Sequence, residues 1–215
     1  MARRRTAAGE RPAYRDVVAN RPPVPVPDGA RPWLGGRLLV ATTRLGDPNF
    51  EGTVVLLLDH GPPGALGIVL NRPTPVPVGE ILEPWHEQAA LAPPGVIFRG
   101  GPVSPDVVIG VARPAGPPPA DDWRAVAGSV GTVDLAVAPD EQPVALAGVR
   151  LFSGYAGWSD GQLEAELDED AWFVVDALAA DVLCPDAERL WHDVLRRQGG
   201  GLSLLAGYPR HPNLN

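Results

Sequence analysis

The sequence predicts a single α+β domain with a mixed, largely antiparallel β-sheet flanked by helices. Short runs of β-branched and aliphatic residues, bounded by Gly and Pro, outnumber the segments with helical periodicity. These runs do not alternate with helices, as parallel βαβ units would require. With 215 residues, 45% of them apolar and 20% charged, the chain can form one compact domain with a substantial core.

Eight segments have the composition of buried strands. They are residues 38–41, 53–58, 66–70, 96–98, 106–111, 130–137, 149–152 and 172–175. Residues 60–64, with the sequence HGPPG, cannot continue a strand, so the second and third segments should pair antiparallel across this loop. Asn71, Arg72 and Pro73 then end the third strand.

Two helices have clear start signals. One begins at Asp186 and ends before Gly199, because apolar residues recur between them on one helical stripe. The stripe contains Ala187, Leu190, Trp191, Val194 and Leu195. The other begins at Ser159, which can cap the helix while Gln162 reaches back. Shorter helices are expected at residues 78–82 and 83–91, where prolines interrupt the pattern.

Residues 1–32 differ sharply in composition from residues 33–215. The first segment contains seven Arg and six Pro and carries a formal charge of +4, whereas the rest carries -12. Its few apolar residues cannot bury a core, so we expect a disordered extension before one domain at residues 33–215. Two interpretations stay open: a solvated leader without a specific role, or a basic arm that contacts the acidic body or an anionic partner.

Composition excludes several classes of protein. No apolar stretch follows Arg3, Arg4 and Arg5 or reaches membrane-spanning length, so we expect a cytoplasmic protein without membrane contact. Cys184 is the only cysteine, which rules out an intrachain disulfide and a thiolate metal cluster. The chain has no lysine, and its 18 Lys and Arg positions are all Arg. Schiff-base chemistry through a lysine is therefore excluded.

The motif FSGYAGW at residues 152–158, followed by SDGQLE, is the most specific feature of the chain. Its candidate ligand or partner residues are Gly154, Tyr155, Gly157, Trp158, Gln162 and Glu164. Free backbone N–H groups at a helix start can hold an anion or a carbonyl, and the aromatic rings can stack on a ligand. The alternative is that the glycines permit a tight turn and the aromatic rings pack into the core. The glycine spacing does not fit a dinucleotide fingerprint.

A second candidate set lies where two predicted strands end. It comprises Asn71, Arg72, Arg99, Gly100 and Gly101. If these ends lie together, their guanidinium groups and backbone amides form one cleft for a polar group. The alternative is two ordinary turns with both arginines paired to acids.

Catalytic and metal-binding patterns are weak. The four histidines, His60, His86, His192 and His211, have no companion at metal-ligand spacing, so we expect no metal, no cofactor and no assignable catalytic residue. Cys184 lies near a helix start, where its pKa could be lowered, or it is a buried spectator.

Five motifs together resemble the YqgE/AlgH family of bacterial proteins. They are GRLLVA at residues 36–41, LGIVLNRP at 66–73, GGP at 100–102, FSGYAGW at 152–158 and PNLN at 212–215. The resemblance covers residues 36–215 and implies an α+β domain. Members are often labelled transcriptional regulators, but the family carries no agreed activity, so no catalytic role transfers to any residue.

The sequence favours a non-enzymatic binding or regulatory protein that acts through a protein partner or a small ligand. No recognition helix is apparent and the body is acidic, so direct DNA binding could depend only on the Arg-rich extension and any transcriptional effect would be indirect. The alternative is an enzyme or sensor that binds a nucleotide-like polar molecule in a cleft near Arg72, Arg99 and Tyr155.

Overall fold

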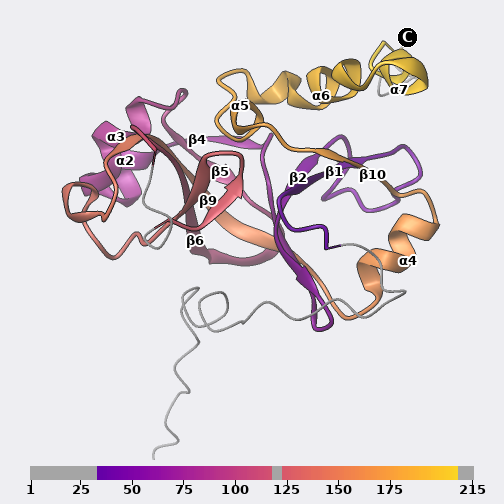
Figure 1. Ribbon diagram of the computed structural model, residues 1–215, viewed down its shortest axis with the longest axis horizontal. Helices are drawn as coiled ribbons and strands as arrows, with labels where there is room; N and C mark the ends of the chain where they lie inside the picture. Colours follow the sequence, from indigo (N-terminus) through magenta and orange to yellow (C-terminus); the bar gives the residue numbers. More distant parts are fainter. Residues whose placement is uncertain (1–32, 118–122, 208–215) are drawn as a thin grey trace, which may run out of the picture.

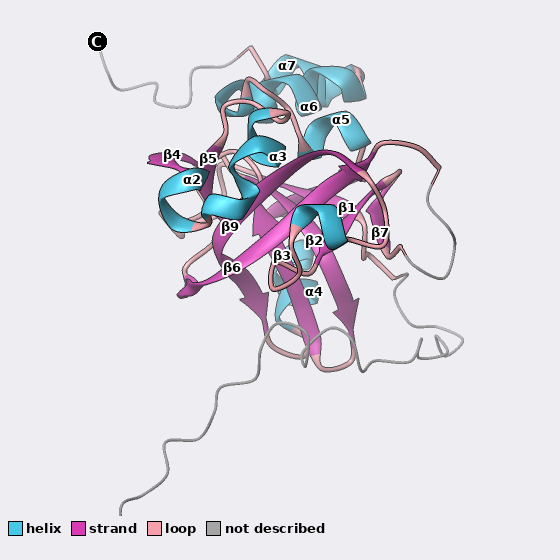
Figure 2. Cartoon of the chain, turned by 90° about the vertical axis from the view of Figure 1, so that its left-hand side faces the viewer, coloured by secondary structure: helices cyan, strands magenta, loops and turns pink. Residues whose placement is uncertain are grey.

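The computed structural model describes residues 33–117 and 123–207, so the extension predicted at residues 1–32 lies outside the described residues. Within the described part, ten strands form one curled sheet with helices around it (Figures 1 and 2). The strands are β1 (Arg37–Ala41), β2 (Val54–Gly61), β3 (Gly64–Val69), β4 (Pro73–Pro77), β5 (Val96–Arg99), β6 (Val103–Pro114), β7 (Ala125–Ala127), β8 (Val130–Val133), β9 (Leu146–Trp158) and β10 (Trp172–Asp176). The predicted α+β class is confirmed.

The sheet is mixed but largely antiparallel, as predicted. Its order is β10-β1-β2-β3-β9-β6-β8-β7, and β4 joins through β5, which itself pairs with β9. Of the pairings between described strands, β5 with β9 is parallel and the others are antiparallel. The hairpin predicted across residues 60–64 is present, with Gly61 opposite Gly64.

The helices cover separate parts of the sheet. They are α2 (Val78–Ile81), α3 (His86–Ala90), α4 (Gln162–Asp168), α5 (Ala179–Val182), α6 (Leu190–Gln198) and α7 (Gly200–Leu205), with 3-10 turns at Glu83–Trp85, Pro139–Glu141 and Ala187–Arg189. Figure 1 shows α5, α6 and α7 along one side, α2 and α3 beside β4 and β5, and α4 at the far end. The predicted stripe of α6 is buried, from Leu190 to Leu195, against a core that includes Leu38 and Val40.

Strand alternation divides the interior. Leu38 and Leu56 face the core under α6, whereas Leu39 and Val55 face a second core that α4 closes with Leu163. A third core packs α2 and α3 against one face of β5 and β9 and contains Trp85 and Leu151.

The strand that differs most in length from its prediction is β9. The sequence predicts a strand at residues 149–152 and a turn at the glycines that follow, but β9 continues to Trp158. Tertiary pairing overrides the local glycine signal, because Val103 of β6 pairs with Tyr155 and Ala65 of β3 pairs with Trp158. In the other direction, β8 ends at Val133 rather than at residue 137, where the Asp134 carboxylate accepts the Ala136 N–H and forms a turn.

Helix starts also differ in detail. The helix predicted at Ser159 begins at Gln162, with Gly161 (φ 72°) as the residue before it. Gln162 does reach back, since its Oε1 accepts the Ser159 N–H at 3.1 Å, but the Ser159 hydroxyl donates to the same Oε1 and caps no helical N–H. The short elements β4, β7, α5 and α7 carry no usable signal: β4 contains three prolines and α7 begins with two glycines.

Candidate functional site

A cleft of about 1160 Å³ lies where β4, the end of β5 and the start of β6 meet the β1–β2 loop. Its described polar lining residues are Asn49, Arg72, Thr74, Arg99, Asp106 and Ser153. Apolar walls come from prolines and from Ile97 and Val108. We call this concavity the arginine cleft, because Arg72 and Arg99 are its described cationic residues.

Arg72 and Arg99 lie directly opposite each other on neighbouring strands. The Arg99 N–H donates to the Arg72 carbonyl at 2.8 Å, and the next pair, Pro73 and Phe98, is in antiparallel register. Opposite residues project from the same face, so both guanidinium groups enter the same cleft. The two strand ends therefore lie side by side at Arg72 and Arg99.

Among residues 33–117 and 123–207, no acid forms the ion pair with Arg72 or Arg99 that the alternative interpretation requires. Arg72 Nη2 donates to the backbone carbonyl of Glu51. Arg99 is exposed, and among the described residues its side chain makes no ion pair. Like charges directly opposite on two strands repel, so this arrangement favours a bound anion between them.

Ser153 adds a hydroxyl to the same wall. It is in parallel register with Arg99, so the two side chains share a face. Its Oγ donates to the Pro105 carbonyl. Because the hydroxyl proton is used, the free capacity of Ser153 is as an acceptor, and the arginines are the donors that a ligand would meet.

A large bulge in β6 supplies the facing wall. Val103 pairs with Tyr155 and Val108 pairs with Ser153, so four residues of β6 lie opposite Gly154 alone. Ser104 adopts φ 45° within this bulge. The bulge places Pro105 and Asp106 at the cleft.

Gly100, Gly101 and Gly154 make this crossing of three strands possible. A Cβ on Gly101 would lie 2.1 Å from the Tyr155 carbonyl carbon, and one on Gly154 would lie 2.7 Å from the Gly101 oxygen. A Cβ on Gly100 would lie 2.3 Å from the Gly154 oxygen. Gly154 also needs φ 71°. These glycines permit close backbone contact between the strands, and Gly101 also lines the cleft.

Asn71 serves the fold next to the cleft. It is buried, and its Oδ1 accepts the Val54 N–H at 2.9 Å while its Nδ2 donates to the Gly52 carbonyl at 2.9 Å. These contacts fix the start of β2 against the end of β3. The predicted candidate thus positions its neighbour Arg72, since its own amide is used.

Tyr155 and Trp158 of the FSGYAGW motif lie apart from the arginine cleft. Trp158 is buried and packs with Phe50 and Trp172, while Tyr155 is half-buried against the core under α6. Gly157 is exposed. The described cleft lining includes none of Tyr155, Gly157 and Trp158, so the ring stacking that the sequence suggested is not placed beside Arg72 and Arg99.

The polar residues of α4 are held by contacts at the opposite end of the sheet. The Glu166 carboxylate accepts the indole N–H groups of Trp158 at 2.9 Å and Trp172 at 2.8 Å, and the Gln162 amide at 3.0 Å. Glu164 Oε1 lies 2.9 Å from Nε2 of buried His60. Glu164 therefore joins α4 to β2, Gln162 bonds only within α4 and the turn before it, and neither residue lines the arginine cleft.

His60 has a defined tautomer in this contact. Its Nδ1 accepts the Leu34 N–H at 3.4 Å, so the ring proton is on Nε2, which donates to Glu164. Through these two contacts, His60 of β2 links Leu34 to α4.

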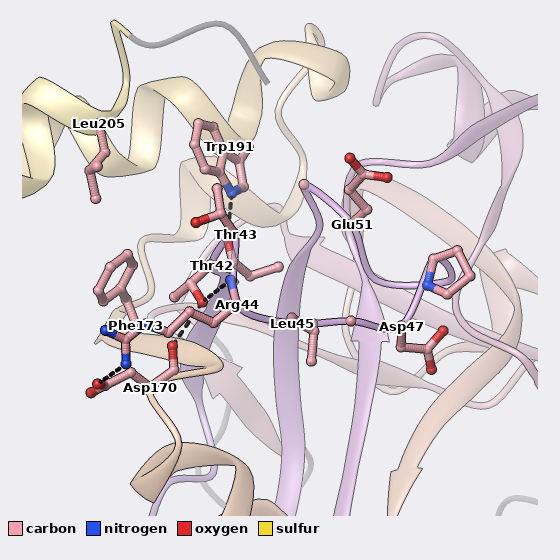
Figure 3. Close-up of a pocket in the computed structure, with 14 residues that line it drawn as sticks. Thr42, Thr43, Arg44, Leu45, Asp47, Glu51, Asp170, Phe173, Trp191 and Leu205 are labelled. Carbon is pink, nitrogen blue, oxygen red and sulfur yellow. Dashed lines mark hydrogen bonds and ion pairs between the residues drawn. The ribbon is translucent and has the colours of Figure 1, made fainter. Parts of the chain in front are cut away.

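A second concavity was not anticipated from the sequence. It has a volume of about 580 Å³ and lies between the β1–β2 loop and the helices α6 and α7. Figure 3 shows Trp191, Phe173 and Leu205 on one side and Asp47 and Glu51 on the other. We call it the Trp191 pocket. Its residues come from four segments far apart in the sequence, and Trp191 carried only the signal of a buried helical stripe.

Polar contacts shape the Trp191 pocket. Arg44 Nη1 pairs with Asp170 at 2.8 Å, and Thr42 Oγ1 donates to the Asp170 carbonyl at 2.8 Å (Figure 3). The Trp191 indole donates to the Ala41 carbonyl at 3.0 Å. Pro48 lines this pocket and also the arginine cleft, so the β1–β2 loop forms a wall of both.

Arg150 is buried, and half-buried Cys184 interacts with it electrostatically. Burial lowers the pKa of Arg150 to about 10, and burial is also the main cause that raises the pKa of the Cys184 thiol. A raised pKa is the opposite of an activated nucleophile, so this favours the spectator interpretation of Cys184.

In residues 33–117 and 123–207, no group of three or more His, Cys, Asp or Glu side chains could hold a metal ion. No helix of that part has the length and apolar character needed to cross a bilayer.

Comparison with known sequences gives consistent relatives. The model of a family described as AlgH-like matches residues 38–203. A UPF0301 protein of Streptomyces coelicolor is 54% identical over 186 residues, which cover 85% of this chain and 95% of the relative. A UPF0301 protein of Thermobifida fusca is 46% identical over 191 residues, which cover 85% of this chain and 96% of the relative.

Solved structures agree with this assignment. The crystal structure of protein DIP2367 from Corynebacterium diphtheriae aligns with a TM-score of 0.75 and 31% identity, over 83% of this chain and 94% of that one. The solution structure of the AlgH protein from Pseudomonas aeruginosa aligns with a TM-score of 0.57 and 31% identity, over 85% and 97% of the two chains. The chain therefore belongs to the AlgH-like family.

Proposed function

We propose that this chain is a non-enzymatic binding protein whose arginine cleft takes an anionic group, a carboxylate or a phosphate, of a protein partner or a small ligand. The observation that carries the proposal is the placement of Arg72 directly opposite Arg99 on one face. Two guanidinium groups in this position can each donate two hydrogen bonds to one anion.

The walls of the cleft support binding without large rearrangement. Pro73, Pro75, Pro102 and Pro105 line it, and their fixed φ angles limit the backbone freedom that a ligand would otherwise have to remove. Ile97 and Val108 offer apolar surface beside the charges. An anion attached to an apolar body fits this combination better than a bare ion.

Membership of the family does not assign a reaction to this chain. The negative charge of the domain favours an indirect regulatory role over direct DNA binding. Residues 33–215 carry a formal charge of -12, which opposes contact with a phosphate backbone. A regulatory effect would pass through the bound partner or ligand, in the cytoplasm, and would not require DNA binding by the domain.

An enzyme or sensor for a nucleotide-like molecule is the second candidate function. The two arginines favour a phosphate in the same place. Tyr155 does not line the cleft, so the base of such a ligand would have to contact the apolar walls instead of an aromatic ring.

Binding of pyrophosphate and of succinate to the purified protein, measured by NMR chemical-shift titration, tests the proposal. We expect saturable shifts at the amides of residues 99–101 and 153–154. Arg99→Ala should abolish saturation, and Arg113→Ala, which changes an exposed arginine of β6 outside the cleft lining, should leave it unchanged. Equal binding by wild type and Arg99→Ala would contradict the proposal.

A further inference from the structure

We propose that the Trp191 pocket is the docking site of the chain's own C-terminal segment, residues 208–215. The first observation is position. Leu205 of α7 lines the pocket, and the described chain ends two residues later, at Gly207. His192 Nδ1 lies 3.0 Å from the Ala206 carbonyl, so this end of the chain is fixed beside α6. The segment 208–215 thus starts near the pocket wall.

Length is sufficient. Eight extended residues can span about 26 to 29 Å, and the segment departs after Gly207, two residues beyond Leu205 of the pocket lining. The volume of about 580 Å³ is within the range of pockets that enclose ligands of moderate size. The segment can therefore reach the floor of the pocket without moving α7.

Charge is complementary. The described lining carries Asp47, Glu51 and Asp170 against Arg44 alone, a formal charge of -2. The segment YPRHPNLN contains Arg210 and His211 and no acidic side chain. Arg44 pairs with Asp170, while Asp47 and Glu51 lie across the pocket from Trp191 in Figure 3. Arg210 is the cation that we place against them.

Apolar surface is complementary as well. Phe173, Trp191 and Leu205 line the pocket, and Leu205 is 39% exposed. Tyr208 and Leu214 are the apolar side chains of the segment. Pro209 and Pro212 restrict the free segment, so ordering it in the pocket costs less conformational entropy than ordering an unrestricted chain of equal length.

Docking would stabilise the β1–β2 loop. This loop supplies residues 42–48 to the pocket, and Pro48 also lines the arginine cleft. The inference is independent of the proposed function, because the segment would hold the loop whether or not the cleft binds an anion.

Hydrogen exchange on the full chain and on a chain ending at Gly207 tests the inference. We expect amides of residues 43–50 to exchange at least about tenfold faster in the shortened chain. A synthetic peptide of residues 208–215 added in trans should restore protection with saturation. The variant Arg210→Glu in the full chain should lose protection while keeping the length, and deletion of residues 1–32 should not change it.

Equal exchange of this loop in the full and shortened chains, together with no saturable peptide binding, would overturn the inference. Protection in the full chain that rises with protein concentration would also overturn it, because the segment would then occupy a second copy. Protection that is lost only on deleting residues 1–32 would assign the pocket to the other end of the chain.

Discussion

The two faces of the β5–β9 strand pair carry arginines in opposite circumstances. On one face, Arg150 is 2% exposed, lies 4.4 Å from the centre of the Phe98 ring, and donates to the carbonyls of Val182 at 3.1 Å and Pro93 at 2.7 Å. On the other face, Arg99 is exposed and has no ion pair with a described residue. Because successive residues of a strand face opposite sides of the sheet, Arg99 and its strand neighbour Phe98 lie in these two different environments.

The difference separates a structural arginine from a binding arginine. Arg150 uses both terminal nitrogens on backbone carbonyls, and although burial lowers its pKa to about 10, it stays protonated at neutral pH. Its charge is stabilised by carbonyl dipoles and a ring. Arg99 and its opposite neighbour Arg72 keep donors for a ligand, at the cost of mutual repulsion.

The largest expected effect comes from a substitution at Gly154, where β9 lies in close backbone contact with the residues that follow β5. Gly154→Ala places a Cβ 2.7 Å from the Gly101 oxygen at a backbone with φ 71°, so we expect a loss of about 4 kcal/mol or more in the free energy of unfolding. Gly157→Ala is the matched control, because its Cβ would meet nothing closer than 3.5 Å. Chemical denaturation measures both, and equal stability of the two variants would contradict the crossing.

The next effect concerns the buried face directly. Arg150→Ala removes the contacts with Phe98, Val182 and Pro93, and we expect it to destabilise the protein by about 3 to 5 kcal/mol. Arg150→Met should cost clearly less, because it keeps apolar volume and removes a buried charge. Thermal unfolding of the two variants checks this order. If Arg150→Ala were no more harmful than Arg99→Ala, the two faces would not differ as we describe.

Two glutamates of the α4 region can be compared in the same way, since Glu166 accepts several hydrogen bonds and Glu169 is exposed. Glu166 accepts two indole N–H groups and one amide, so Glu166→Gln should destabilise by about 1 to 2 kcal/mol. Exposed Glu169 makes no side-chain contact with the described residues that would be lost, and Glu169→Gln should change stability by less than about 0.5 kcal/mol. Urea denaturation at pH 7 compares them. The same loss in both would show that the indole contacts contribute nothing.

A smaller effect links Arg150 to its neighbour Cys184. Burial raises the pKa of the folded thiol, so its thiolate fraction at pH 8 is below that of the unfolded chain, and alkylation by iodoacetamide should be slower when folded. The corresponding stability is present below the unfolded pKa and is lost as pH rises through the folded value. Because the charge of Arg150 lowers the Cys184 pKa, Arg150→Met should slow alkylation further. Faster alkylation in that variant would contradict this coupling.

Apolar patterning was enough to predict much of the fold but not the crossing. The buried stripe of α6 and the β2–β3 hairpin follow from local periodicity and from prolines in the connecting loop. β9 was predicted too short because Gly154 carries the same local signal in a turn and in a close contact between strands. Only the pairing partners distinguish these two uses, and they are far away in the sequence.

The site was predictable to a similar extent. Arg72 and Arg99 were candidates because each ends a strand, and their convergence depended on those strands pairing. The strand that carries this pairing, β4, has three prolines and no strand signal. Tyr155 and Trp158 attracted a ligand interpretation because an aromatic residue in a packed core and one in a binding site look alike in a single sequence.

Unfolding of wild type and Arg99→Ala with and without pyrophosphate, at constant ionic strength, tests the central claim most directly. Without the anion, we predict that Arg99→Ala is as stable as wild type or more stable by up to about 0.5 kcal/mol, because a like-charge contact is removed. At an anion concentration of about 100 Kd, wild type should gain about 2.7 kcal/mol and the variant nothing. A variant that is less stable than wild type without the anion, and that gains equally with it, would contradict the account.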